Sequence, residues 1–145
     1  MAEAYWLLHA DGASLGNPGP GGAGAVLYDD QGRVRAEISL YLGPRVTNNE
    51  AEYQGLLAGL KRALELGVTH LKIRMDSELA VRQVLGVYKV KNARLAVFFK
   101  EVTASLAKFG RYEIAHVRRE LNREADALAS RAARRGPLDA KREEA

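Results

Sequence analysis

The chain has 145 residues, a net charge of +4 at pH 7 and no cysteine. The lack of cysteine excludes disulfides and thiolate metal sites, and with only three histidines a metal site would have to use mainly carboxylate oxygens. No apolar stretch approaches the roughly 20 residues that span a bilayer, and the first residues lack the basic region of a signal peptide. We therefore expect one cytoplasmic domain without membrane attachment, whose small positive charge is compatible with a polyanionic partner.

The first third of the chain predicts three strands. A short apolar run over residues 4–10 stops at Asp11, and a loop rich in glycine and proline follows as far as Gly22. Glycines in such a loop let another backbone or a phosphate come close. Further strands are expected over 23–28 and, from alternating apolar residues, over 33–42. Short turns join the three, so we expect antiparallel pairs.

The rest of the chain predicts helices that alternate with strands. Apolar residues recur at helical spacing from Asn49 to Leu66, with Thr47 or Asn48 as the N-cap. The remaining expected elements are a strand over 70–75, a short helix after Ser77, a helix over 93–109, a strand over 112–117 and a helix from Asn122, as its cap, to about Arg135. The order β-β-β-α-β-α-α-β-α predicts an α/β fold, a five-stranded mixed sheet flanked by helices. We assign residues 1–136 to this domain and 137–145 to a polar tail.

Four carboxylates stand where this fold can bring them together. Asp11 and Asp76 follow the first and fourth predicted strands, and neighbouring parallel strands end at one edge of a sheet. Glu52 and Asp126 lie in the first turns of two helices, in rows shared with apolar or small residues. Each acid alone also fits a structural role in a turn, a cap or a solvated surface.

A cluster of four unpaired carboxylates would repel itself unless a cation neutralised it. Ligand sets made only of oxygen select Mg²⁺ or Mn²⁺. Two such ions about 4 Å apart are a common device for the hydrolysis of phosphodiesters. The pattern therefore favours a metal-dependent enzyme that acts on nucleic acid.

Four segments resemble, in the right order, the motifs of type 1 ribonuclease H, the family that cuts the RNA strand of RNA–DNA hybrids. They are Asp11–Gly19, Thr47–Glu52, Met75–Ser77 and Asn122–Ala129. The resemblance extends over about residues 4–133, and it implies the same mixed sheet that the periodicity predicts.

The resemblance also implies roles for individual residues. Asp11, Glu52, Asp76 and Asp126 would be catalytic and would hold two Mg²⁺ ions, for which Mn²⁺ can substitute, with Asp11 between them. The products would carry 5′-phosphate and 3′-hydroxyl ends. Six residues are expected to bind the substrate, three of them asparagines that match readers of the minor groove: Gly12, Ser14, Asn17, Thr47, Asn48 and Asn49. For Asn48 and Asn49, helix capping is the alternative.

Two features depart from the family pattern. Many members have a histidine between the last strand and the last helix, where this chain has Arg118, Arg119, Glu120 and Leu121. The resemblance implies that this histidine assists proton transfer or product release. We regard Arg119 and Glu120 as candidates for part of this auxiliary role. The basic protrusion of some members is reduced here to residues 86–94, so we expect weaker binding of the nucleic acid.

The leading interpretation is a monomeric endonuclease for RNA–DNA hybrids that needs no protein partner, with double-stranded RNA as a further candidate substrate. The alternatives are a related nuclease for DNA junctions or double-stranded RNA, a non-catalytic hybrid-binding module, and an acidic metal-binding fold without a nucleic acid. A binding module has no need of four acids. The asparagines at 17, 48 and 49 argue against the last alternative.

Overall fold

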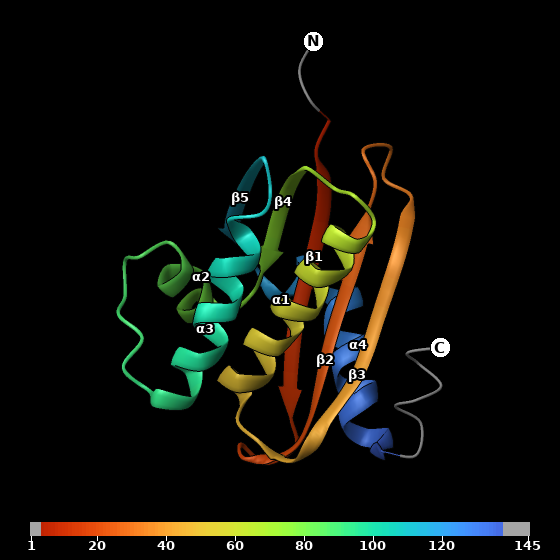
Figure 1. Ribbon diagram of the computed structural model, residues 1–145. Helices are drawn as coiled ribbons and strands as arrows, with labels where there is room; N and C mark the ends of the chain where they lie inside the picture. Colours follow the sequence, from red (N-terminus) through yellow and green to blue (C-terminus); the bar gives the residue numbers. More distant parts are fainter. Residues whose placement is uncertain (1–3, 138–145) are drawn as a thin grey trace.

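One twisted mixed sheet organises the computed structural model, which describes residues 4–137 (Figure 1). Its strands lie in the order β3-β2-β1-β4-β5. The antiparallel strands are β1 (Trp6–Ser14), β2 (Gly19–Tyr28) and β3 (Val34–Val46). The strand β4 (His70–Met75) runs parallel to β1, and β5 (Arg111–His116) runs parallel to β4. The predicted fold class and order of elements are confirmed.

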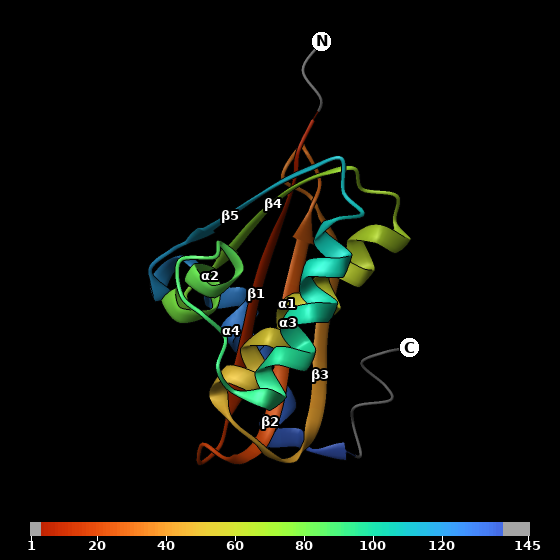
Figure 2. The same ribbon diagram turned by 60° about the vertical axis from the view of Figure 1, so that its left-hand side comes forward.

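Helices cover both faces of this sheet. They are α1 (Asn48–Glu65), α2 (Glu78–Val84), α3 (Ala93–Leu106) and α4 (Arg123–Arg135), and the 3-10 turn η1 (Arg119–Leu121) precedes α4. Figures 1 and 2 show α1 and α3 on one face, with α4 on the other face across β1, β2 and β3. None of the helices between residues 4 and 137 is both long and apolar enough to cross a bilayer.

The main core lies between the sheet and the layer of α1 and α3. Leu8 of β1 and Ile73 of β4 are fully buried there against Leu56 and Leu60, which share one face of α1. Spacing of four residues places the two leucines on one side of the helix, and alternation along each strand places the strand residues on the facing side of the sheet. Both periods were visible in the sequence, which is why these elements were predicted at the right places.

The first three strands extend further than predicted at the end of the sheet near Asp11. β1 continues beyond Asp11 to Ser14, and β2 already begins at Gly19, so only residues 15–18 connect them. Gly43 and Pro44 do not end β3, which runs to Val46. The expected loop up to Gly22 was therefore wrong, because most of its glycines belong to paired strands.

The caps of the helices follow the sequence with one exception. Thr47 is the N-cap of α1 and forms a capping box with Glu50, and Ser77 caps α2 through the backbone N–H of Ala80. Asn122 precedes α4 as predicted, but its side chain makes no capping hydrogen bond and turns into the interior. The predicted tail 137–145 lies, apart from its first residue, outside the described residues.

Candidate active site

The parallel pairing of β1 and β4 brings the first two predicted acids side by side. Leu8 pairs with Ile73 and His9 with Arg74, and the same register continued by two residues sets Asp11 beside Asp76. Asp11 does not end its strand, as the sequence suggested, but lies inside β1. Asp76 directly follows β4.

A glycine next to Asp11 lets α1 approach the sheet. A Cβ atom on Gly12 would lie 2.1 Å from the backbone carbonyl carbon of Ala51. No side chain fits in that space, so the first turn of α1 touches β1 directly. The residue after Ala51 is Glu52, and the contact therefore carries the third acid to the level of Asp11.

A second glycine lets α4 approach the opposite face of the sheet in the same way. Gly24 of β2 pairs with Asp11, and a Cβ atom on it would lie 2.2 Å from the carbonyl oxygen of Ala125 in α4. The next residue, Asp126, is the fourth acid. Two close backbone contacts, one on each face of the sheet, thus bring both helical acids to Asp11.

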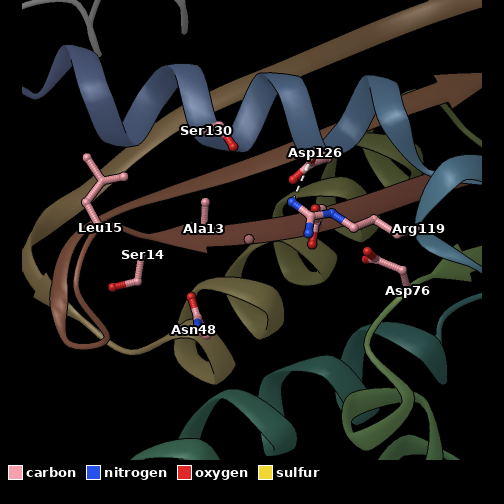
Figure 3. A pocket seen from close by; sticks show the side chains of 10 residues that line it. Ala13, Ser14, Leu15, Asn48, Asp76, Arg119, Asp126 and Ser130 are labelled. Carbon is pink, nitrogen blue, oxygen red and sulfur yellow. Dashed lines mark ion pairs between the residues drawn. The ribbon is translucent and has the colours of Figure 1, made fainter.

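A pocket of about 340 Å³ opens where these elements meet. Asp11, Asp76 and Asp126 line it, and Figure 3 shows Asp126 on α4 and Asp76 on the segment that follows β4. Glu52 is not among its lining residues, but it lies close enough to Asp76 for the two charges to interact, and it accepts a hydrogen bond from Ser77. The remaining lining residues are Gly12, Ala13, Ser14, Leu15, Asn48, Arg119 and Ser130.

Two acids of this site, Asp11 and Glu52, hold their protons unusually well. Burial, followed by the negative charge of Asp76, raises the pKa of Asp11 to about 8. The charges of Asp126 and Glu52 raise this pKa further, so all three other acids act on Asp11. Burial likewise raises the pKa of Glu52 to about 7. The site therefore carries more negative charge than its surroundings compensate, and a bound cation would relieve it.

The donor set fits a divalent cation that prefers oxygen. Between residues 4 and 137 no three His, Cys, Asp or Glu side chains stand close enough together to hold one metal ion by themselves. Mg²⁺ is commonly held by one or two carboxylates together with water and the phosphates of a substrate, so an open set of carboxylates suits it. The same open set makes the pocket accessible to a large substrate.

Of the two predicted auxiliary residues, Arg119 lies nearer to the acids. Its guanidinium nitrogen is 3.7 Å from a carboxylate oxygen of Asp126, as Figure 3 shows, and its side chain stays 79% exposed. An ion pair this exposed is weak, so Arg119 is held near the acids without being fixed to them. Glu120 does not line this pocket, but it lines a neighbouring one together with Arg119, Arg123 and Asp126.

The short connection between β1 and β2 is tied to the start of α1. The side-chain oxygen of Asn17 accepts a hydrogen bond of 2.9 Å from the backbone N–H of Asn48. The hydroxyl of Ser14 donates to the carbonyl oxygen of Val46 and accepts from the backbone N–H of Asn17. The predicted substrate-binding residues Ser14, Asn17 and Asn48 thus form one connected surface. The hydroxyl hydrogen of Ser14 is already donated to Val46, so it is not available to a substrate.

The capping of α1 separates the roles of three neighbouring residues. The hydroxyl of Thr47 accepts from the backbone N–H of Glu50 and lies 3.0 Å from a carboxylate oxygen of the same residue. The alternative that Asn48 caps α1 was therefore wrong. Asn48 is exposed and Asn49 is half-buried, and neither amide is needed for the cap.

Comparison with known proteins identifies the fold and the family. The family described as "Reverse transcriptase-like" matches residues 9–132. The "Bifunctional protein Rv2228c" of Mycobacterium tuberculosis is 44% identical over 125 residues, which are 86% of this chain and 34% of that protein. The chain thus spans about a third of the length of this curated relative.

Two solved structures agree closely with the fold. RNase H1 from Halobacterium salinarum matches with a TM-score of 0.87 and 35% identity, over 92% of this chain and 100% of that chain. LC11-RNase H1 in complex with an RNA/DNA hybrid matches with a TM-score of 0.83 and 36% identity, over 90% and 97%. The chain belongs to the ribonuclease H family. The predicted family is confirmed. The predicted enzyme class is confirmed as well, because curated relatives are named ribonuclease H.

One buried contact of the candidate site was missed in the sequence. Asn122 was interpreted as a helix cap, yet it is fully buried and its side-chain nitrogen lies 3.1 Å from a carboxylate oxygen of Asp76. His9 contacts the other end of this amide. Strand alternation could have indicated His9, because it stands two residues before Asp11 and therefore on the same face. No sequence signal distinguishes a buried asparagine from a capping one at this position.

Proposed function

We propose that this ribonuclease H cuts the RNA strand of RNA–DNA hybrids by metal-dependent hydrolysis, leaving 5′-phosphate and 3′-hydroxyl ends. The observation that carries the proposal is the convergence of Asp11, Asp76 and Asp126 on one open pocket, whose rim includes the amide of Asn48. The complex of the relative LC11-RNase H1 with an RNA/DNA hybrid supports the class of substrate.

In this proposal the four acids would hold two Mg²⁺ ions, for which Mn²⁺ could substitute. We assign the central place to Asp11, because the charges of Asp76, Asp126 and Glu52 all act on it. When bound, two such ions supply an activated water and stabilise the leaving oxygen of the phosphodiester. The contribution of the chain is to hold four carboxylates in a partly buried site, where charge interactions are stronger than in water.

We assign recognition of the RNA strand to the surface formed by Asn17, Asn48 and Asn49. A 2′-hydroxyl both donates and accepts, and a side-chain amide offers one group of each kind. The hydrogen bond from Asn48 to Asn17 holds the two segments in one arrangement before the substrate binds. Thr47, also expected to bind the substrate, would have to share its hydroxyl between Glu50 and a phosphate, so we expect its contact with the substrate to be weak.

The auxiliary role falls to Arg119 ahead of Glu120. Its guanidinium stands at the rim of the pocket beside Asp126, where the negative charge of a phosphate would arrive. A mobile cation at this place can attract the phosphate and help release the cut product.

The decisive experiment is a cleavage assay with labelled RNA–DNA hybrid, double-stranded RNA, DNA duplex and single strands, each with Mg²⁺ and with EDTA. We expect cleavage of the hybrid in Mg²⁺ only, products that carry a 5′-phosphate, and no cleavage by Asp11→Asn. Asp30→Asn is a matched control, because Asp30 lies in an exposed turn between β2 and β3.

The assay separates the alternatives. An enzyme that leaves the hybrid intact in Mg²⁺ would refute the proposal. Equal cleavage of double-stranded RNA would extend the substrate class, whereas tight binding of the hybrid without cleavage would indicate a binding module. Substantial turnover by Asp11→Asn would show that the central acid has been assigned wrongly.

A further inference from the structure

A buried amide stands directly behind the acid at the end of β4. Asn122 has no exposed surface, and its side-chain nitrogen lies 3.0 Å from the carbonyl oxygen of Ala10 and 3.1 Å from a carboxylate oxygen of Asp76. Its side-chain oxygen lies 3.1 Å from Nδ1 of His9. The backbone carbonyl of Asn122 also accepts the hydrogen bond from Asp126 that begins α4. One residue thus touches the surroundings of three of the four acids.

The partners of this amide determine which way it faces. The carbonyl oxygen of Ala10 can only accept, and so can the ionised carboxylate of Asp76, so both require the NH₂ end of Asn122. The oxygen end must then face His9, and Nδ1 of His9 must carry the hydrogen. A reversed amide would set its oxygen against two other acceptors and leave the His9 hydrogen without an acceptor in this network.

His9 is itself held in place by its surroundings. It lies on β1 two residues before Asp11, on the same face of the sheet. Its ring is half-buried and meets the ring of Tyr28 edge to face, with the ring centres 5.8 Å apart. The contacts with Tyr28 and Asn122 restrain the ring and keep Nδ1 facing the amide.

We propose that His9 is a positioning residue for the divalent cation, acting through Asn122 on Asp76. The N–H of His9 selects one orientation of the Asn122 amide, and that amide holds one oxygen of Asp76, so the carboxylate presents its other oxygen to the pocket. Without this support, repulsion from Asp11 and Glu52 would favour rotation of Asp76 away from them. The inference rests on the proposed function, since it concerns the cation that the four acids would hold.

Two substitutions separate the hydrogen bond from the space that the ring fills. His9→Phe keeps a ring against Tyr28 but has no N–H. His9→Asn loses the ring, but its side-chain nitrogen is as many bonds from the backbone as Nδ1 of histidine, so it can donate at the same place. If the donor matters, Asn should rescue and Phe should not, whereas a role in packing gives the opposite order. Should Phe not be accommodated, His9→Leu makes the same comparison.

The test is calorimetric titration of the full chain with Mg²⁺ in the absence of nucleic acid, together with urea unfolding in EDTA. We expect His9→Phe to weaken Mg²⁺ binding by about tenfold, at the lower end of the effect of groups that support metal ligands. His9→Asn should bind Mg²⁺ nearly as well as the parent chain. His70→Leu is the matched control, because His70 begins β4, far along the strand from Asp76, and should leave Mg²⁺ binding unchanged.

A spectroscopic measurement tests the orientation directly. At alkaline pH, where the ring is neutral, ¹⁵N shifts of His9 should show the hydrogen on Nδ1. A hydrogen on Nε2 would overturn the inference, and so would equal Mg²⁺ binding by the Phe and Asn variants. Loss of Mg²⁺ binding in both variants would overturn it as well, since the ring would then be what matters. If the parent chain binds no Mg²⁺ and cuts no hybrid, the proposed function itself has failed, which is a distinguishable result.

Discussion

Replacing Asp11 with asparagine should make the metal-free protein more stable while it abolishes activity. The carboxyl group of Asp11 is nearly buried, and its neighbours Asp76, Asp126 and Glu52 are also acids. Asparagine has almost the same shape and cannot ionise, so the variant avoids placing a charge among like charges. A site built to hold cations is expected to lower stability in this way when the cations are removed.

The size of the effect follows from the pKa. Burial and the neighbouring acids raise the pKa of Asp11 from 3.8 to about 8, so the folded state binds more protons than the unfolded state between these values. Stability of the metal-free chain must therefore fall as the pH rises through this window and level off above it. At about 1.4 kcal/mol per pH unit, the upper bound at pH 7 is about 4 kcal/mol. Water in the pocket and relaxation reduce it, and we expect a gain of about 2 kcal/mol for Asp11→Asn.

The assay is equilibrium unfolding in urea at several values between pH 5 and pH 9, first in EDTA and then in saturating Mg²⁺. The advantage of Asp11→Asn should be small at pH 5 and largest near pH 8. In Mg²⁺ the parent chain should gain stability by ligand binding, and the variant should gain much less. Asp29→Asn is the contrasting control. Asp29 accepts hydrogen bonds from the backbone of Gln31 and Arg33, which lower its pKa, so its replacement should reduce stability at neutral pH.

Two results would refute the reasoning. The first is an Asp11→Asn variant that is no more stable than the parent chain in EDTA at pH 8, since the acid would then not be under electrostatic strain. The second is a gain that does not change with pH, since a packing effect rather than a charge would explain it.

Four further predictions follow from the site and its surroundings. Gly24→Ala should lower the free energy of unfolding in urea by about 3 kcal/mol, because its methyl group would displace α4, and a fully stable variant would contradict the close contact. Arg119→Ala should slow single-turnover cleavage by about 10- to 100-fold without weakening Mg²⁺ binding, and more than Glu120→Ala does; the opposite order would reverse our assignment. Asn17→Ala should raise KM for the hybrid by about fivefold, equivalent to about 1 kcal/mol, with kcat little changed, whereas an unchanged KM would remove Asn17 from recognition. Binding of the hybrid should weaken less steeply with salt than in relatives that have the basic protrusion, because residues 86–92 are a short connection here, and an equally steep dependence would show that other cations replace it.

The order of the elements, and which acids can approach one another at one edge of the sheet, could be predicted because they depend on local patterns. Helical spacing in α1 and alternation in β4 reflect which side chains face the core, and that information is present in each segment by itself. Asp11 and Asp76 could be found because each directly follows a segment predicted to form a strand, although β1 continues past Asp11, and the motifs that resemble ribonuclease H named Glu52 rather than the neighbouring Glu50. Glu50 is indeed occupied elsewhere, since it closes the capping box of α1.

The errors arose where one residue type has two physical uses. Glycine permits turns, but it also permits contact between backbones, and at Gly12 and Gly24 the second use applies. The sequence does not show the partner helix, so strands β1 and β2 were predicted too short. Asn122 is a similar case, since the same amide can cap a helix or support a carboxylate, and only the position of Asp76 decides between the two.

The close contacts of Gly12 and Gly24 fix where the two helices that carry acids lie relative to Asp11. Both helices that carry acids are seated within one residue of the same point on the sheet, so the distances between acids are set there and not through the connecting loops. An insertion or deletion in a distant connection should not change the distances between the four acids. The loop after α2 and the turn between β2 and β3 are therefore places where a binding segment could be inserted without moving the four acids.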